Sequence, residues 1–390
     1  MRTVTPIQTA SPPSRDVEAA FTNWKWQQQN ALTSVNDLVR TFPPLAGTPL
    51  LARISRRLGS RKLGLTPYYV NLIERDAHGL PRVDDPLWLQ VVPTWTEDSN
   101  HALSYDGESE NWELPHEMVT PICQHKYDNR VIIRAVNVCH AYCQFCYEAL
   151  RTLETESDKG KFKKSDWAAT LKYIADHPEI DEAILSGGEP LMHADPQLAG
   201  LLRDLRALRP DLIIRVHTRA LTFNPYRITE ALVAALRETR VTAVGVHVAH
   251  PREITAEFIA AVGKLRSAVP LLFANIALLA GINDSLPVMK ELCLTLYRNG
   301  VLPHYLYQFM PFSPGDTQFS SDISRGIAIV SQMKRRISNM AVPEFVLPHK
   351  TGKFTVPLHL PGEAPQLESR EGREFMNFRN WKGEPCVFPG

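Results

Sequence analysis

Residues 131–146 read VIIRAVNVCHAYCQFC, an apolar strand-like run followed almost at once by three cysteines. That run is the first of six strand-like segments, and a segment with helical periodicity follows each of them. Strictly alternating strands and helices predict parallel strands joined by right-handed crossovers. Six such units predict an α/β fold, a partial (β/α)6 barrel whose chemistry lies at the carboxyl ends of the strands. We expect strands at 131–136, 182–185, 212–217, 243–248, 271–279 and 305–309, and helices at 166–177, 196–208, 229–237, 256–268, 286–298 and 323–337.

The segments on either side of this barrel differ from it in composition. Residues 1–16 are polar and proline-bearing, which predicts a disordered tail. Residues 17–120 open with a helical pattern from 17 to 42 and predict a helical, mixed N-terminal extension. The barrel then spans 121–340, and the proline-rich residues 341–390 predict an extended C-terminal cap.

Composition excludes several classes of protein. Lys and Arg number 43 against 42 Asp and Glu, a net charge of +1 over 390 residues, which argues against nucleic-acid binding by bulk electrostatics. No apolar run approaches the ~18 residues of a membrane span. The N-terminus lacks the apolar core of a signal peptide, so a cytoplasmic location is expected. Six cysteines are too few for a disulfide scaffold, yet three of them fall within eight residues.

Those three are Cys139, Cys143 and Cys146, in the loop after the first barrel strand. Thiolates at this spacing can converge on one inorganic cluster, and a [4Fe–4S] cluster normally takes four cysteines. Three would leave one iron open to a substrate or cofactor. Zinc is the competing ligand, but a closed zinc site needs four donors, and His140 could be the fourth only through a strained turn. Three incidental buried cysteines are the remaining interpretation.

The CxxxCxxC pattern, with an aromatic residue before its last cysteine, resembles the radical S-adenosylmethionine (SAM) superfamily. A second superfamily feature follows the second strand, where 186–190 read SGGEP and match the GGE motif. The resemblance implies a [4Fe–4S] cluster on the three cysteines whose open iron binds SAM. It also implies that an electron from a reductant such as flavodoxin or ferredoxin cleaves SAM to a 5′-deoxyadenosyl radical. The SAM-contacting residues it implies are Tyr142, Phe145, Gly187, Gly188, Glu189, Thr218 and Arg219.

A closer resemblance, to lysine 2,3-aminomutase and its relatives, covers residues 20 to 360 in order. Those enzymes combine the radical generator with pyridoxal phosphate (PLP) and move nitrogen from Cα to Cβ of an amino acid. The resemblance therefore implies an isomerase with a small amino acid-like substrate, and a homo-oligomer is expected. It is carried by Trp24–Gln27, Thr66–Tyr69, Arg227–Thr229, His250–Thr255, Gly281–Asp284 and Tyr305–Gln308.

The same resemblance places PLP between the barrel and the cap. Lys126, Tyr127 and Arg130 match the run that contacts the phosphate, although Lys126 replaces an arginine and so lacks its bidentate fork. The lysine that bonds PLP aligns best with Lys353, and Lys350 is the rival. This assignment makes the C-terminal cap a PLP-contacting segment.

Departures from the family concern the substrate. Glu148 stands where the family has an arginine that pairs with the substrate carboxylate, unless Arg151, about one turn on, takes over that role. Two family aspartates bind the far ammonium of lysine; Asp284 matches the first and Met310 replaces the second. Since losing one partner of a buried charge costs several kcal/mol, we expect a substrate other than free lysine. Either Glu148 faces an amino or guanidino group, or the substrate carboxylate is masked or displaced; alternatively, Glu148 pairs with Arg151 or Arg219 and touches no substrate.

Two other functions stay open at this point. One is a radical SAM oxidoreductase or epimerase that acts on a peptide or natural-product intermediate without amino migration. The other is a degenerate cluster-binding sensor, against which the intact triad and GGE motif count. The remaining cysteines, Cys123, Cys293 and Cys386, are interpreted as bystanders, and the zinc-binding cysteines of the family's C-terminus are absent.

Overall fold

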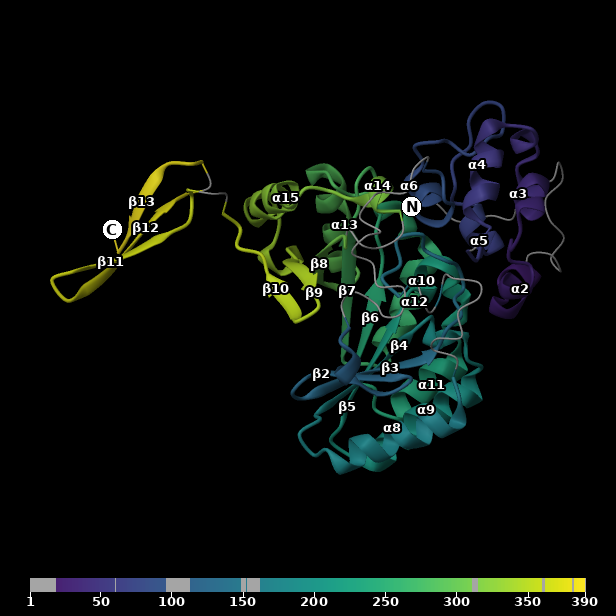
Figure 1. Ribbon diagram of the computed structural model, residues 1–390, viewed down its shortest axis with the longest axis horizontal. Coiled ribbons are helices and arrows are strands. Elements are labelled where there is room, and N and C mark those ends of the chain that lie inside the picture. Colours follow the sequence, from purple (N-terminus) through teal and green to yellow (C-terminus); the bar gives the residue numbers. More distant parts are fainter. Residues whose placement is uncertain are drawn as a thin grey trace.

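The computed structural model describes residues 19–59, 61–95, 113–148, 152, 162–310, 315–359, 362–380 and 382–389. Its centre is one ten-stranded sheet in the order β1 to β10 (Figure 1). The predicted tail, residues 1–16, lies outside the described residues. The strands are β1 (Met118–Thr120), β2 (Cys123–Tyr127), β3 (Arg130–Val136), β4 (Glu182–Gly187), β5 (Ile213–Thr218), β6 (Ala243–His247), β7 (Leu271–Leu278), β8 (Leu302–Gln308), β9 (Glu344–His349) and β10 (Gly352–Thr355).

Strands β3 to β8 are parallel and confirm the α/β barrel predicted from the alternating pattern. Most residues of β4 are buried, as expected of a parallel strand covered on both faces. Helices cover the outer face, and apolar side chains of strands and helices share one core. These helices are α8 (Lys164–Asp176), α9 (Asp195–Leu208), α11 (Glu230–Glu238), α12 (Ala256–Arg266), α13 (Leu286–Arg298) and α15 (Ile323–Arg336).

The sheet extends beyond the six predicted strands at both edges. On one side β2 and then β1 join β3 as antiparallel strands. On the other, β9 runs parallel to β8 and β10 turns back against β9. The sheet therefore continues across the boundary expected at residue 340. Within the described residues its order ends at β1 and β10 without closing, which makes the barrel partial.

The N-terminal extension is a set of short helices rather than the continuous helical pattern expected over 17–42. Ser34 and Asp37 form a capping box, which starts a new helix and explains the break. Aromatic and aliphatic residues of this extension share a second core with the cysteine loop, including Ala141. The helices are α2 (Trp24–Gln29), α3 (Val35–Thr41), α4 (Pro49–Arg57), α5 (Pro67–Val70) and α6 (Pro86–Val91), and α10 (Ala220–Phe223) and α14 (Asp316–Phe319) follow later in the chain.

The C-terminal segment is not simply extended. It ends in a separate antiparallel sheet of β11 (Gln366–Arg370), β12 (Arg373–Arg379) and β13 (Pro385–Phe388), which projects from the body (yellow in Figure 1). Across the described part of the chain, no helix combines the length and apolar character that crossing a membrane requires.

Candidate active site

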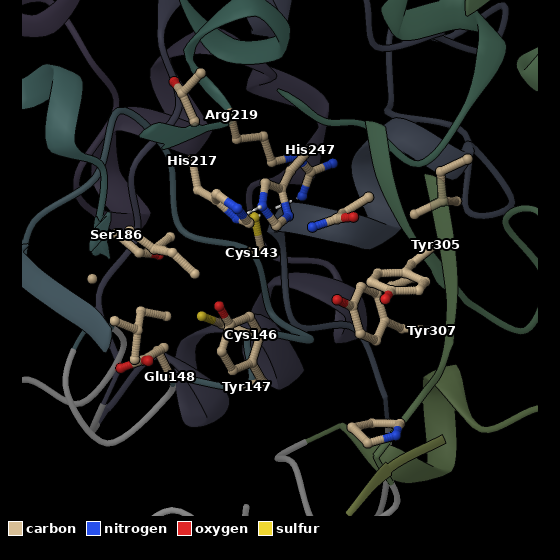
Figure 2. A pocket seen from close by; sticks show the side chains of 18 of the residues that line it. Cys143, Cys146, Tyr147, Glu148, Ser186, His217, Arg219, His247, Tyr305 and Tyr307 are labelled. Carbon is tan, nitrogen blue, oxygen red and sulfur yellow. Dashed lines mark hydrogen bonds between the residues drawn. The ribbon is translucent and has the colours of Figure 1, made fainter. Parts of the chain in front are cut away.

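One cavity of about 330 Å³ lies where the carboxyl ends of the barrel strands meet β2, β10 and the cysteine loop. Its wall includes residues from every strand between β2 and β8. Figure 2 shows Cys143 and Cys146 facing Tyr305 and Tyr307 across this space. The cavity therefore lies at the carboxyl ends of the barrel strands, where the sequence pattern predicts the active site.

The three predicted cluster cysteines all line the cavity and are half-buried. Their loop is fixed by backbone hydrogen bonds to the N-terminal extension, from Tyr142 N to Gly64 O (3.4 Å) and from Gln144 N to Gln90 O (2.8 Å). Burial raises the pKa of all three thiols, and that of Cys146 to about 12. Buried thiolates therefore need a positive partner, which a cluster supplies. Within the described ranges, no three Cys, His, Asp or Glu side chains are placed to hold a single metal ion.

The GGE motif packs directly against the start of the cysteine loop. Gly187 has a φ of +110°, and a Cβ there would lie 2.6 Å from Val136 O. A Cβ on Gly188 would lie 2.5 Å from Val138 O, so both positions require glycine. The close approach lets Glu189 N donate to Val138 O at 2.8 Å. The second strand end and the cysteine loop are thereby held as one unit.

The Glu189 carboxylate is buried and joins two strand ends. It accepts hydrogen bonds from Thr218 Oγ1 (2.8 Å) and from Arg219 N (2.7 Å). Burial raises its pKa, although these donors oppose the rise. The structure thus brings together three of the SAM-contacting residues that the resemblance implies.

Arg219 connects this unit to the cysteines. Its Nη1 donates to Cys143 Sγ at 2.7 Å, and its Nη2 lies 3.3 Å from Glu253 Oε1 and also contacts Gln90. The sequence interpretation missed Gln90. Glu253 stood inside the quoted run 250–255, but that run gave no signal of its buried ion pair.

Lys353 lies at the opposite end of the cavity, on β10. Its Nζ is 4.9 Å from the ring centroid of Tyr305 and 5.5 Å from that of Tyr307, and its backbone N–H donates to Tyr127 Oη at 3.0 Å. The residue as a whole is exposed, whereas its ammonium is crowded by the cavity wall. Desolvation and the charges of Arg215 and Arg130 lower its pKa to about 8.

The other predicted PLP residues lie around Lys353 but are engaged differently. Arg130 stacks over the Tyr127 ring at 4.0 Å. Lys126 forms a buried ion pair with Glu117 at 2.7 Å and donates to the backbone carbonyl of Lys350. The rival Lys350 is exposed and does not line the cavity.

Glu148 is paired with a residue that the sequence interpretation did not consider. Nε of Arg134 lies 3.0 Å from both carboxylate oxygens of Glu148, and both side chains are almost completely buried. Arg134 also contacts Glu113. Arg219, one of the two expected partners, binds Cys143 and Glu253 instead, and Arg151 lies outside the described residues.

Asp284 and Met310, the two positions expected to bind the far ammonium of lysine, do not both line the cavity. Asp284 accepts from Gly281 N at 3.0 Å and pairs with Arg325 at 3.1 Å. It is not among the residues that line the cavity, whereas Met310 is. An aspartate held by an arginine and an apolar side chain do not form a cation site.

A half-buried histidine pair forms part of the cavity wall. His217 Nδ1 and His247 Nε2 lie 3.1 Å apart, so one donates and the other accepts (Figure 2). Burial lowers the pKa of both, that of His247 to about 4, so both are neutral at physiological pH. Several residues that line the same cavity also carry a buried polar atom without a protein partner: His217 Nε2, Arg215 Nε, Arg219 Nε, Asn275 Oδ1 and Gln308 Oε1.

Comparison with known proteins agrees with this arrangement. A family model described as the radical SAM superfamily matches residues 133–290. The chain is 31% identical to the L-lysine 2,3-aminomutase of Fusobacterium nucleatum subsp. nucleatum, over 99% of this chain and 89% of that protein. The chain belongs to the lysine 2,3-aminomutase family of radical SAM enzymes. It is 30% identical to the L-lysine 2,3-aminomutase of Acetoanaerobium sticklandii, over 93% of this chain and 83% of that one. It is also 27% identical to the glutamate 2,3-aminomutase of Clostridioides difficile, over 94% and 82%.

Membership makes the chain a radical SAM isomerase and implies a [4Fe–4S] cluster and SAM as cofactors. The donor set fits both groups, because three thiols face a cavity whose wall carries unpartnered buried polar atoms. Buried polar atoms are normally hydrogen-bonded, so a wall with several unsatisfied ones is suited to a polar ligand. The family assignment leaves the substrate open.

Proposed function

We propose that the protein is a PLP-dependent radical SAM aminomutase that moves an amino group between adjacent carbons of an amino acid, or a derivative, other than free lysine. The observation that carries the proposal is the cavity itself. The cysteine triad forms part of its wall and Lys353 another part, so a radical source and a PLP-bonding amine would face one substrate.

The environment of Lys353 suits a covalent bond to PLP. A lysine bonds a carbonyl only through its neutral amine, so a pKa near 8 leaves a useful neutral fraction at physiological pH. Arg130 and Arg215, which lower that pKa, are cations suited to a phosphate. PLP, when bound, delocalises an unpaired electron next to the substrate nitrogen.

The other end of the cavity holds the radical generator in a fixed geometry. Glu189 orients Thr218 and the backbone of Arg219, while Arg219 holds Cys143. The N-terminal extension packs over the cysteine loop and shields it from water. Exclusion of water protects a reactive radical from side reactions.

Two features support a substrate other than free lysine. Arg134 neutralises Glu148, so the position no longer carries a cation for a substrate carboxylate. Met310 and the paired Asp284 provide no site for a second ammonium. Among the described residues, a free amino acid with a cationic side chain would therefore find neither of the two ion-pairing positions that the family uses.

Borohydride reduction of PLP-loaded protein followed by peptide mapping tests the PLP part. We expect a phosphopyridoxyl group on Lys353, lost in Lys353→Ala and retained in the matched variant Lys350→Ala. Absence of any modified lysine would remove PLP from the proposal and favour the oxidoreductase or epimerase alternative.

The substrate part is tested by calorimetry on PLP- and SAM-loaded protein. We expect free L-lysine to bind at least about tenfold more weakly than an uncharged or carboxyl-masked amino acid, because the family's ion pairs to lysine cannot form at Glu148, Asp284 and Met310. Equal, tight binding of L-lysine to the wild type and to Glu148→Arg would contradict the proposal.

A further inference from the structure

The cavity wall offers little negative charge to a substrate. Among the described residues that line the cavity, only Glu148 and Glu189 are acidic. The carboxylate of Glu148 is paired with Arg134, and that of Glu189 accepts hydrogen bonds from the end of β5. A substrate side chain that ends in an ammonium or a guanidinium group would therefore lack a counter-ion in the described part of the wall.

Four ring side chains from neighbouring strands form a row in this wall. We call this set the ring row: His247 on β6, His217 on β5, Phe273 on β7 and His304 on β8. The ring centroids of His217 lie 5.3 Å from those of His247 and 5.7 Å from those of Phe273. The Phe273 centroid lies 5.4 Å from that of His304. Each ring therefore contacts the next along the wall.

Gly245 on β6 makes room for the ring row. A Cβ at Gly245 would lie 2.7 Å from Cζ of Phe273 and 3.1 Å from Cδ2 of His217. Gly245 is also the register partner of His217 in the ladder between β5 and β6, and of Phe273 in the ladder between β6 and β7. A strand glycine often marks a place where other groups approach closely. Here its missing side chain lets both rings pack beside it, which holds the His217 ring in place.

The position of the His217 ring leaves one nitrogen for a ligand. Its Nδ1 lies 3.1 Å from His247 Nε2 (Figure 2), whereas its own Nε2 is buried and has no partner among the described residues. Desolvation, His247 and the cations Arg215 and Lys353 lower the pKa of His217, so the ring is neutral at physiological pH. A neutral imidazole has one donor and one acceptor nitrogen, and the contact with His247 uses one of them. Nε2 therefore offers the other, as an uncharged hydrogen-bonding position.

A carboxamide fits this position better than a carboxylate does. The proposed function assigns Arg130 and Arg215 to the phosphate of PLP and Lys353 to its carbonyl. The other lysine and arginine side chains among the described residues of the wall, Lys126 and Arg219, already form ion pairs. A substrate carboxylate would thus be buried without a cation of its own, whereas a carboxamide needs none and can both donate and accept.

We propose that His217 is a specificity-determining residue whose Nε2 hydrogen-bonds a carboxamide at the end of the substrate side chain. The inference rests on the proposed function and deepens it by naming glutamine-like amino acids as the substrate class. His247 is a positioning residue, because it holds His217 through the contact between their ring nitrogens.

The test compares three amino acids that share the same α-amino and α-carboxyl groups. L-Glutamine carries the carboxamide, L-glutamate replaces it by a carboxylate, and L-homoleucine replaces it by an isopropyl group of similar shape. Each is titrated by calorimetry into protein loaded with cluster, PLP and SAM but given no reductant, so that binding is measured without turnover. We expect wild type to bind L-glutamine about tenfold more tightly than either of the others, because only the carboxamide satisfies the buried nitrogen without adding a charge.

Two matched variants assign the preference to one ring. His217→Phe keeps a ring but removes both nitrogens, and His304→Phe makes the same change elsewhere in the ring row. We expect His217→Phe to bind L-glutamine and L-homoleucine about equally, and His304→Phe to keep the wild-type preference. The ratio of the two affinities is the readout, since a general loss of packing weakens both ligands alike. His217→Gln, which retains a hydrogen-bonding end, should restore part of the preference.

The outcomes separate this inference from the proposed function. An unchanged preference in His217→Phe, its loss in His304→Phe instead, or tighter binding of L-glutamate to wild type would each overturn the role of His217. Iron content and borohydride trapping of PLP show whether each variant is folded and loaded. A wild-type chain in which no lysine bonds PLP would overturn the proposed function, whereas PLP on Lys353 without a preference for L-glutamine would overturn only this inference.

Discussion

The charged residues around the cysteine loop and those at the expected substrate positions are used in opposite ways. At the cysteine end, Glu189 and Arg219 join strand ends to the cluster loop, and their partners come from the same short motifs. At the expected substrate positions, Glu148 and Asp284 are tied to arginines that no motif contains. The contacts proposed for radical generation can thus be recognised from local sequence, whereas the contacts expected to select the substrate are replaced by ion pairs that only the fold brings together.

The largest effect is expected from a substitution in the cysteine loop. Cys143→Ala removes one of the three proposed cluster ligands and the acceptor of the Arg219 Nη1 hydrogen bond. We expect loss of the cluster and a fall in 5′-deoxyadenosine formation of about 10⁴-fold or more. Iron analysis and chromatography of the product measure both. The bystander variant Cys293→Ala should keep its cluster, and a fully loaded Cys143→Ala protein would contradict the assignment.

At the opposite end of the cavity, Lys353→Ala should lower turnover by about 10³-fold, because it removes the amine that we propose bonds PLP. Cluster content should be unchanged, since Lys353 lies on β10 and not in the cysteine loop. Turnover together with iron content separates the two ends. Lys350→Ala is the matched control; a variant at 353 that retains wild-type turnover would move the PLP lysine elsewhere.

The Glu148–Arg134 pair offers a test on stability. Glu148→Leu leaves the Arg134 guanidinium without its nearest carboxylate, which should lower the free energy of unfolding by about 3–5 kcal/mol. Arg134→Leu/Glu148→Leu should regain part of that loss, because it removes the guanidinium left behind by Glu148→Leu but also takes one ion-pair partner away from Glu113. Denaturant titration of the three proteins measures the pattern. Equal losses in the single and double variants would show that the pair does not act as a unit.

This pair also shows where sequence reasoning stops. All six barrel strands could be predicted because each has an apolar run and a helix after it. Side chains two residues apart in a strand point to the same face, so Arg130, Ile132 and Arg134 share one face of β3. That repeat could have suggested Arg134 as a partner for Glu148. The pairing itself joins two residues across a turn, and nothing local distinguishes Arg134 from any other strand arginine.

The edge strands and the surroundings of Lys353 are harder to predict from the sequence. Strands β1, β2, β9 and β10 give weak strand signals, because β1 has only three residues, β2 and β10 are short and mostly polar, and β9 contains a proline. Their pairing comes from the edges of the sheet that they cover. The position of Lys353 was predicted by resemblance. Its crowding by Tyr305, Tyr307 and Arg215 depends on residues more than 40 positions away and appears only in the fold.

A pH series tests the proposed role of Lys353. The pKa of Lys353 is lowered to about 8, so its neutral amine is abundant above pH 8 and declines below it. We expect the rate of PLP attachment to rise about tenfold per pH unit up to pH 8 and then level off. Borohydride trapping at timed intervals measures this rate. A continued rise toward pH 10, as for an ordinary lysine, would show that the cavity does not depress this pKa.

The smallest expected effect concerns Asp284. Since Arg325 is exposed, the pair should add at most about 1 kcal/mol to stability, and Asp284→Asn should remove no more than that. Its carboxylate lies outside the cavity wall, so KM for the true substrate should change by less than about twofold. Met310→Ala, a change inside the wall, should alter KM more than Asp284→Asn does. The reverse order would mean that Asp284 releases Arg325 to hold a substrate cation, and the substrate end would then keep one family contact.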